Sequence, residues 1–159
     1  SKAVVAILGE IIWTVNPKHD NLQSLIAYLR SYVAGFFEHT SVQCTINFPE
    51  NVPAMAISPD VKHNLFLVIK ESLNNVIKHA NASAVHIGFH LAGESYYVEI
   101  TDNGTGISKM TTPGFGNGLL NMQRRMEAIN GTFVINSGKD AGTVITLQGA
   151  FDFETESSV

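Results

Sequence analysis

Apolar positions along this chain follow two different periods, and the changes between them predict its helices and strands. A repeat of three to four residues predicts helices over residues 2–14, 21–36, 59–80 and 119–129. A repeat of two predicts strands over residues 42–48, 85–91, 96–100, 133–135 and 144–147. Pro17 separates the first two helices, and Ser58-Pro59 favours a helix start at that point.

The order of these elements predicts an α+β fold. Strands that follow one another directly favour hairpins, whereas a doubly wound nucleotide-binding fold alternates strands with helices. We therefore expect a two-layer α/β sandwich, in which helices cover one face of a mixed, mainly antiparallel sheet. Between Ile100 and Leu119 the chain is rich in glycine, which indicates a loop.

Composition narrows the classes of protein that fit this pattern. The 159 residues suit one domain, and the 45% apolar and 15% charged content excludes a disordered chain and a coiled coil. The net charge of −4 comes without a long basic run, so we expect no nucleic-acid partner. No apolar stretch reaches the roughly 18 residues of a membrane helix. The single Cys44 excludes an intrachain disulfide and fits a reducing compartment, so we expect a cytoplasmic domain.

The predicted helix over residues 59–80 carries polar side chains beside its apolar stripe. At about 100° per residue, one sector holds the expected core positions, which are Leu65, Ile69, Leu73, Val76 and Ala80. The adjoining sector holds Glu71, Asn75, Lys78 and His79. Carboxylate and amide oxygens suit Mg²⁺, and a lysine can pair with a phosphate. An ordinary solvated helix face explains the same spacing, so this pattern leaves both interpretations open.

A second candidate site begins where the strand over residues 96–100 ends. Asp102 follows that strand, and its carboxylate can accept a hydrogen bond from an exocyclic amine such as that of adenine. We expect Asn103-Gly104 and Gly106 to supply turns with positive φ that let a ligand approach the backbone. A simple Asp-Asn-Gly turn without a ligand is the alternative.

Two further glycine-rich segments extend the pattern. Gly114, Gly116 and Gly118 lead toward a helix start, where exposed backbone N–H groups favour an anion. No Gly-Lys-Ser/Thr follows, so the segment is not a Walker A loop. Gly142-Thr143 opens the last strand, and the Thr143 hydroxyl can serve a ligand in the same cleft. A surface loop and a hairpin turn explain these two segments equally well.

Taken in order, these four segments resemble the ATP-binding Bergerat fold shared by DNA gyrase, Hsp90, sensor histidine kinases and MutL. Residues 118–147 are similar to the catalytic domain of sensor histidine kinases, in the subgroup of NarX and DesK. The resemblance covers about residues 40–150. It implies that the chain binds ATP and Mg²⁺ and transfers the γ-phosphoryl group to a histidine on a separate dimerisation domain.

The resemblance also implies a role for each matching position. Asn75 matches the Mg²⁺-binding asparagine, and Glu71 matches a carboxylate that polarises the attacking group or orients a metal-bound water. Asp102 matches the aspartate that binds the adenine amine, and Thr143 matches a threonine near the adenine. The remaining matches surround the phosphates or shape the pocket, and they are Lys78, His79, Gly104, Gly106, Gly114, Gly116, Gly118 and Leu119. We expect residues 103–118 to form a lid that becomes ordered around the triphosphate.

One departure from the family concerns the phosphoacceptor. His19-Asp20 offers the expected dipeptide, but it follows Pro17 closely and lies too near the ATP-binding region. The surrounding segment resembles the junction after the dimerisation helices. We therefore expect residues 1–38 to be the end of a dimerisation helix and a junction helix. Residues 40–150 are then the catalytic domain, and residues 151–159 are a polar tail.

The resemblance implies partners that this chain does not contain. They are its own dimerisation and phosphoacceptor domain and a response regulator. The full-length protein is then expected to be a homodimer, and an anchor in the inner membrane is one possible arrangement for it. Two alternatives stay open. One is a serine kinase and anti-sigma factor of the same fold, which also carries the Glu71-x-x-x-Asn75 spacing. The other is a degenerate fold that only mediates interactions.

Overall fold

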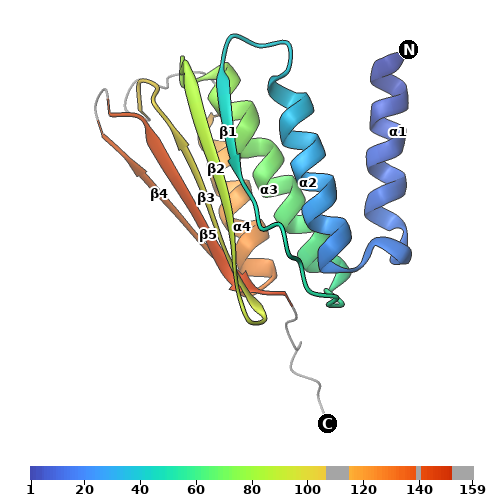
Figure 1. Cartoon of the computed structure of the whole chain (residues 1–159). Helices are drawn as coiled ribbons and strands as arrows, with labels where there is room; N and C mark the ends of the chain where they lie inside the picture. Colours follow the sequence, from blue (N-terminus) through green and yellow to red (C-terminus); the bar gives the residue numbers. More distant parts are fainter. Residues whose placement is uncertain (107–114, 139–140, 152–159) are drawn as a thin grey trace.

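The computed structural model describes residues 1–106, 115–138 and 141–151 of the chain (Figure 1). The elements occur in the predicted order, with one short 3₁₀ helix, η1, added after the first helix. The helices are α1 (Lys2–Val15), η1 (Pro17–His19), α2 (Leu22–Phe37), α3 (Pro59–Lys78) and α4 (Phe115–Ala128). The strands are β1 (Gln43–Asn47), β2 (Ala84–Ala92), β3 (Ser95–Asp102), β4 (Thr132–Ser137) and β5 (Thr143–Ala150).

The strands form one five-stranded sheet in the order β1-β2-β3-β5-β4. β1 runs parallel to β2, and every other neighbouring pair is antiparallel. The prediction of a mixed, mainly antiparallel sheet is therefore confirmed. The register places Asp102, the last residue of β3, between Val85 of β2 and Thr143 of β5. Residues from three strands thus meet at one end of the sheet.

The helices α2, α3 and α4 cover one face of this sheet, which confirms the two-layer sandwich (Figure 1). The alternating residues Val85, Ile87 and Phe89 of β2 are buried against them. Leu65, Ile69 and Leu73 of α3 are fully buried, as their shared sector predicted, and Val76 and Ala80 follow them into the core. Each fully buried side chain of this size stabilises the fold by about 1.5–3 kcal/mol.

Helix α1 packs outside the sandwich, against α2 and α3 (Figure 1). Its one buried side chain is Trp13, which stacks on Tyr28 with ring centroids 4.0 Å apart. Lys62 of α3 is fully buried beneath it. The Lys62 ammonium donates to the Trp13 carbonyl at 3.0 Å and pairs with Asp20 at 2.7 Å. The ammonium therefore caps the carboxyl end of α1 and fixes that end on the sandwich.

Candidate functional site

Helix α3 presents two polar side chains, Glu71 and Asn75, one turn apart. The Asn75 side chain is only 8% exposed, and Glu71 is half-buried. We expected Asn75 beside the core rather than within it, and this expectation is wrong in its degree of burial. A buried amide loses its hydration, which hydrogen bonds to the protein or to a ligand have to replace. A solvent-exposed helix face would leave Asn75 exposed, so its burial next to Leu73 and Val76 does not fit that interpretation.

The carboxyl end of α3 is built from the same helix turn. The Asn75 carbonyl accepts hydrogen bonds from the backbone N–H groups of His79 at 3.0 Å and Ala80 at 3.2 Å, which ends the helix. Lys78 is the last helical residue and is exposed, and His79 is the half-buried C-cap. Two basic side chains therefore follow Asn75 by about one turn.

Asp102 lies at the end of β3 with an exposed fraction of 8%. One carboxylate oxygen accepts the backbone N–H of Gly104 at 2.8 Å. Burial raises the pKa of Asp102 above its ordinary value, and backbone hydrogen bonds from Gly104 and Thr143 counter part of that rise. The site therefore holds a desolvated carboxyl group that is braced by the backbone on two sides.

Glycines allow three backbone segments to close around this carboxyl group. Gly104 does not have positive φ, so our turn explanation is wrong for it. A Cβ on Gly104 would instead overlap the Ala80 carbonyl at the end of α3. Gly106 has φ +80°, as predicted, and Gly142 has φ +75° and passes against the Asp102 carbonyl. Close approach explains Gly104, and backbone conformation explains Gly106 and Gly142.

Asn103 is a positioning residue that the sequence analysis treated only as part of a turn. Its side-chain oxygen accepts the backbone N–H groups of Ser83 at 3.0 Å and Ala84 at 2.9 Å, and its amide donates to the Ser83 hydroxyl at 2.9 Å. These bonds tie the loop after Asp102 to the start of β2. The Asn103-Gly104 pair after a strand is the sequence feature that could have indicated this role. The sequence does not reveal the hydrogen-bond partners of Asn103, because they lie 19 and 20 residues away.

Thr143 completes the end of the sheet. It is 4% exposed and lies directly opposite Asp102 in the β3–β5 pair. Its hydroxyl lies 3.4 Å from the Ser137 hydroxyl, which in turn donates to the Gly142 carbonyl at 3.2 Å. The predicted neighbours Asp102 and Thr143 are therefore brought together, with β4 supplying an additional hydroxyl.

Helix α4 brings the third glycine segment against α3. It begins at Phe115, earlier than predicted, so Gly116 and Gly118 lie in its first turns rather than in a loop. A Cβ on Gly118 would stand 3.0 Å from the Glu71 carboxylate oxygen, so the absence of a side chain lets α4 approach Glu71. Leu119 packs partly buried against the core. Gly114 and the central part of the expected lid, residues 107–114, lie outside the described residues.

A pocket of about 240 Å³ opens between α3 and α4. Glu71 and Gly118 line it, together with Leu67, Lys70, Asn74, Asn121, Met122 and Arg125. Lys70 also pairs with Glu10 of α1 at 2.8 Å, so one wall of the pocket is connected to α1. Asp102 and Thr143 are not part of this lining. An open cavity of about 880 Å³ lies elsewhere, between α2 and residues 49–53, and it holds none of the predicted site residues.

The fold belongs to the two-layer α/β sandwich class, with the predicted site residues Asp102 and Thr143 side by side at one end of its sheet. A family model described as "Histidine kinase-, DNA gyrase B-, and HSP90-like ATPase" matches residues 60–152. The chain belongs to this family. The match begins at the start of α3 and ends just after β5, so it spans all the predicted site residues.

Two proteins that the chain resembles in sequence are histidine kinases. The chain is 30% identical over 125 residues to the oxygen sensor histidine kinase NreB of Staphylococcus carnosus, covering 78% of this chain and 35% of the relative. It is 30% identical over 146 residues to the signal transduction histidine-protein kinase/phosphatase DegS of Brevibacillus brevis, covering 92% of this chain and 37% of the relative. These relatives confirm the resemblance to the histidine kinase catalytic domain. The chain spans about a third of their length.

Solved structures agree with the fold. The histidine kinase domain of the Erythrobacter litoralis EL346 blue-light activated histidine kinase has a TM-score of 0.65 at 18% identity, covering 80% of this chain and 61% of that one. The Acinetobacter baumannii histidine kinase AdeS has a TM-score of 0.60 at 13% identity, covering 82% and 65%. Among the residues that the structure describes, no helix is both long and apolar enough to cross a membrane.

Proposed function

We propose that this chain positions ATP with Mg²⁺ so that the γ-phosphoryl group reaches a histidine on a separate dimerisation domain. The observation that carries the proposal is the buried Asp102 carboxyl group at the end of β3, opposite Thr143 and close to the end of α3. Such a group, held by backbone N–H donors, has an unused acceptor capacity that an adenine amine satisfies. The Thr143 hydroxyl supplies a second polar contact in the same place.

The phosphates and the metal belong, in this proposal, to the α3 side of the site. The Asn75 amide oxygen and the Glu71 carboxylate are the hard oxygen donors that Mg²⁺ prefers. No group of three or more His, Cys, Asp and Glu side chains in the described residues could hold a metal ion, so most ligands would come from phosphate and water. When bound, Mg²⁺ neutralises charge on the phosphates. Lys78 adds a positive charge and His79 adds an imidazole about one turn after Asn75.

Glu71 acts, in this proposal, on the accepting histidine. Its carboxylate lines the pocket between α3 and α4 and lies next to Gly118, which has no side chain. From there it can accept a proton from the attacking imidazole or orient a metal-bound water. Gly116 and Gly118, with Gly114, allow the backbone to approach the phosphates closely. Placement and charge neutralisation then supply most of the catalysis.

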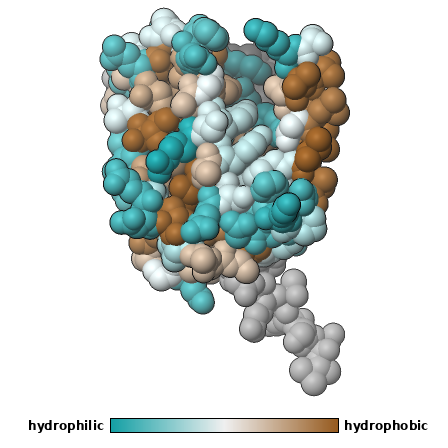
Figure 2. Space-filling model, turned by 45° about the vertical axis from the view of Figure 1, so that its right-hand side comes forward, coloured by the Kyte–Doolittle hydropathy of each residue, from teal (hydrophilic) through white to brown (hydrophobic). Residues whose placement is uncertain are grey.

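Helix α1 has the surface expected for the end of a dimerisation helix. Apolar side chains that are at least half exposed cover it along its length, and they are Val4, Val5, Ile7, Leu8, Ile11, Ile12 and Val15. Figure 2 shows hydrophobic surface gathered along the side of the molecule that α1 forms. We infer that residues 1–38 join residues 40–150 to a dimerisation domain. The proposal also includes a homodimeric full-length protein and a response regulator that accepts the phosphoryl group. The domain itself is then cytoplasmic, beside a sensor that is anchored in the membrane.

The test separates nucleotide binding from phosphoryl transfer. We expect the isolated chain to bind ATP with Mg²⁺ and to leave itself unlabelled with γ-labelled ATP, because His19 lies in the short helix between α1 and α2. A dimerisation domain with its phosphoacceptor histidine, added as a separate protein, should become labelled, and acid should remove the label. Acid-labile label on the isolated chain that His19→Gln abolishes, or acid-stable label on a serine of a partner protein, would contradict the proposal.

A further inference from the structure

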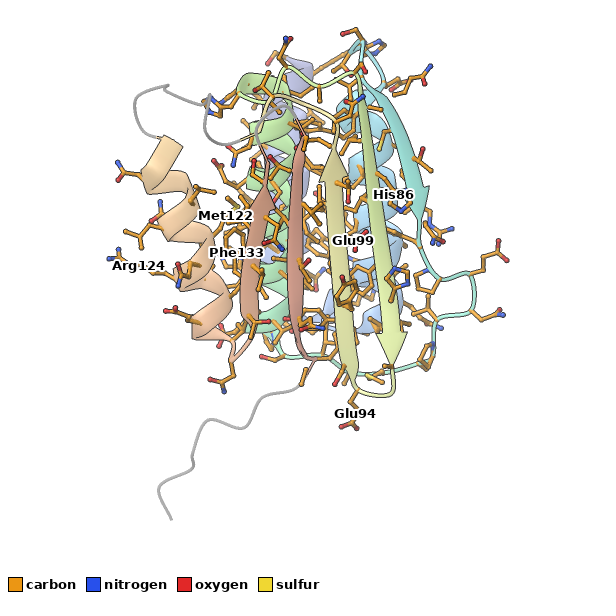
Figure 3. All side chains as sticks on the ribbon, turned by 90° about the vertical axis from the view of Figure 1, so that its left-hand side faces the viewer. His86, Glu94, Glu99, Met122, Arg124 and Phe133 are labelled. Atoms are coloured by element: carbon orange, nitrogen blue, oxygen red, sulfur yellow. The ribbon has the colours of Figure 1, made fainter. Side chains whose placement is uncertain are left out.

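Ser137, at the end of β4, extends the row of polar side chains at the candidate nucleotide site. It lies directly opposite Thr143 in the β4–β5 pair, and Thr143 lies directly opposite Asp102 in the β3–β5 pair. The three strands run side by side, from β4, marked by Phe133, across β5 to β3, marked by Glu99 (Figure 3). Residues that are directly opposite share one face of a sheet, so the two hydroxyls and the carboxylate form one row.

The direction of the hydrogen bonds in this row follows from the chemistry of its groups. A backbone carbonyl only accepts, so the Ser137 hydroxyl donates its one proton to the Gly142 carbonyl at 3.2 Å. The Ser137 oxygen is then an acceptor toward the Thr143 hydroxyl at 3.4 Å, and Thr143 is the donor. This second contact is long, and hydrogen bonds at functional sites often shorten in the complex with a ligand.

Ser137 also meets the loop that follows Asp102. A Cβ on Gly106 would stand 2.8 Å from the Ser137 hydroxyl oxygen and would overlap the Gly138 carbonyl. The hydroxyl group therefore lies where the turn before β5 and the loop after β3 meet. A side chain in this position can set the orientation of the Thr143 hydroxyl without a contact of its own to the ligand.

We propose that Ser137 is a positioning residue that makes Thr143 an acceptor for the adenine amine, an inference that rests on the proposed binding of ATP. With its proton donated to Ser137, the Thr143 hydroxyl presents lone pairs to the ligand, and the Asp102 carboxylate is an acceptor as well. A planar amine has two N–H donors, whose acceptors lie about 5 Å apart at ordinary hydrogen-bond lengths. Opposite residues in an antiparallel pair have Cβ atoms about 4.5–5.5 Å apart, so Asp102 and Thr143 match both donors.

This arrangement selects against a purine with an oxygen in place of the amine. Hypoxanthine carries such an oxygen, which would face two acceptors and find no donor. Removal of the Ser137 hydroxyl frees the Thr143 proton, and the Thr143 hydroxyl can then donate to that oxygen. Loss of the Ser137 hydroxyl therefore weakens the binding of adenine nucleotides and reduces the preference for them over hypoxanthine nucleotides.

The experiment is calorimetric titration of the whole chain with ADP and with inosine diphosphate (IDP), whose base is hypoxanthine, in the presence of Mg²⁺. Ser137→Ala should lower the affinity for ADP roughly threefold to tenfold, the ordinary effect of one neutral hydrogen bond, and leave the affinity for IDP unchanged or higher. Ser137→Thr keeps a hydroxyl group and should keep the affinities of the parent chain. In the Thr143→Val background, Ser137→Ala should have no further effect, because it acts through Thr143.

A matched control is Thr132→Ala, which removes an exposed hydroxyl at the other end of β4, opposite Gln148. This variant should bind both nucleotides as the parent chain does. Equal losses for ADP and IDP in Ser137→Ala, no preference of the parent chain for ADP, or an undiminished loss in the Thr143→Val background would overturn the role of Ser137 but not the nucleotide site. A parent chain that binds neither nucleotide would overturn the proposed function as well. Thermal unfolding checks that each variant folds.

Discussion

The backbone of Gly104 lies directly against the carbonyl of Ala80 at the end of α3. A Cβ at position 104 would overlap that carbonyl, and the next residue, Thr105, donates its backbone N–H to the same oxygen at 2.8 Å. The loop that follows Asp102 is thereby joined to the helix that carries Glu71 and Asn75. The geometry of the candidate site therefore depends on the absence of one side chain.

This relationship predicts that Gly104→Ala destabilises the protein. The new methyl group must push the loop away from α3, and overpacking of this kind costs about 1–3 kcal/mol in the free energy of unfolding. Gly35→Ala is the matched control, because a Cβ on Gly35, in α2, meets nothing within 4 Å. Alanine there should stabilise the protein by about 0.5–1 kcal/mol through helix propensity. Urea denaturation measures both, and equal effects of the two substitutions would contradict the explanation.

The sequence predicted the fold well because the core depends on local periods. The stripe that contains Leu65, Ile69 and Leu73 needs only helical spacing to be recognised, and the β2–β3 and β4–β5 pairs join strands that are consecutive in the chain. The β3–β5 pair skips β4 and does not follow from strand order. The contacts that shape the site are different in kind. Gly104 meets Ala80 and Asn103 binds Ser83 across a hairpin of intervening sequence, which no local pattern encodes.

The start of α4 and the burial of Asn75 are two further features that local sequence patterns did not predict. Glycine-rich sequence favours a loop, yet Gly118 lies within α4, where its missing side chain accommodates Glu71. Helical spacing alone predicts Asn75 at the rim of the core, whereas the structure leaves it only 8% exposed. Tertiary packing overrode the local preference in both cases.

We predict that Asp102→Asn separates nucleotide affinity from stability. The substitution replaces a charged acceptor for the adenine amine, so ADP and ATP affinity should both fall roughly 10- to 100-fold. The unfolding free energy should respond differently. Because the folded carboxyl group has a raised pKa, ionisation costs stability, and this cost is absent below the unfolded pKa of 3.8 and complete above the folded pKa.

The variant should therefore match the parent chain near pH 3 and be at least as stable near pH 7. Denaturation across this pH range and calorimetry with ADP measure the two effects. Glu99→Gln is the matched control, because it makes the same carboxylate-to-amide change on β3 but on the opposite face of the sheet. Unchanged ADP binding in Asp102→Asn would remove Asp102 from the site.

Asn75→Ala should remove the dependence of ATP binding on Mg²⁺. The amide oxygen is the proposed metal ligand on α3, and alanine offers no donor in its place. Since Asn75 is 8% exposed, we also expect a loss of about 1–3 kcal/mol in stability, which leaves the chain folded at low temperature. Calorimetric titrations with ATP, with Mg²⁺ and with EDTA, measure the dependence. Asn64→Ala, on the same helix but near its start, should retain it.

The buried ion pair between Lys62 and Asp20 gives the last prediction. Lys62 is fully buried, and besides Asp20 its ammonium binds the carbonyls of Trp13 at 3.0 Å and Asn16 at 3.4 Å. Lys62→Ala leaves these acceptors at the end of α1 without a donor and opens a cavity. We expect a loss of about 3–5 kcal/mol in the free energy of unfolding.

Lys70→Ala is the control for this loss, because the Lys70–Glu10 pair also joins α3 to α1. In that pair the Lys70 side chain is 34% exposed and the Glu10 side chain is 20% exposed. Solvent screens that pair, so its removal should cost under about 1 kcal/mol. Trp13 is the only tryptophan of the chain and lies 5.0 Å from the Lys62 ammonium, so its fluorescence follows the release of α1 during denaturation. If Lys62→Met proves as stable as the parent chain, packing of the aliphatic stem rather than the charge fixes α1. Equal losses for Lys62→Ala and Lys70→Ala would show that burial adds nothing to the pair, and the anchoring of α1 would then lie in the stacking of Trp13 on Tyr28.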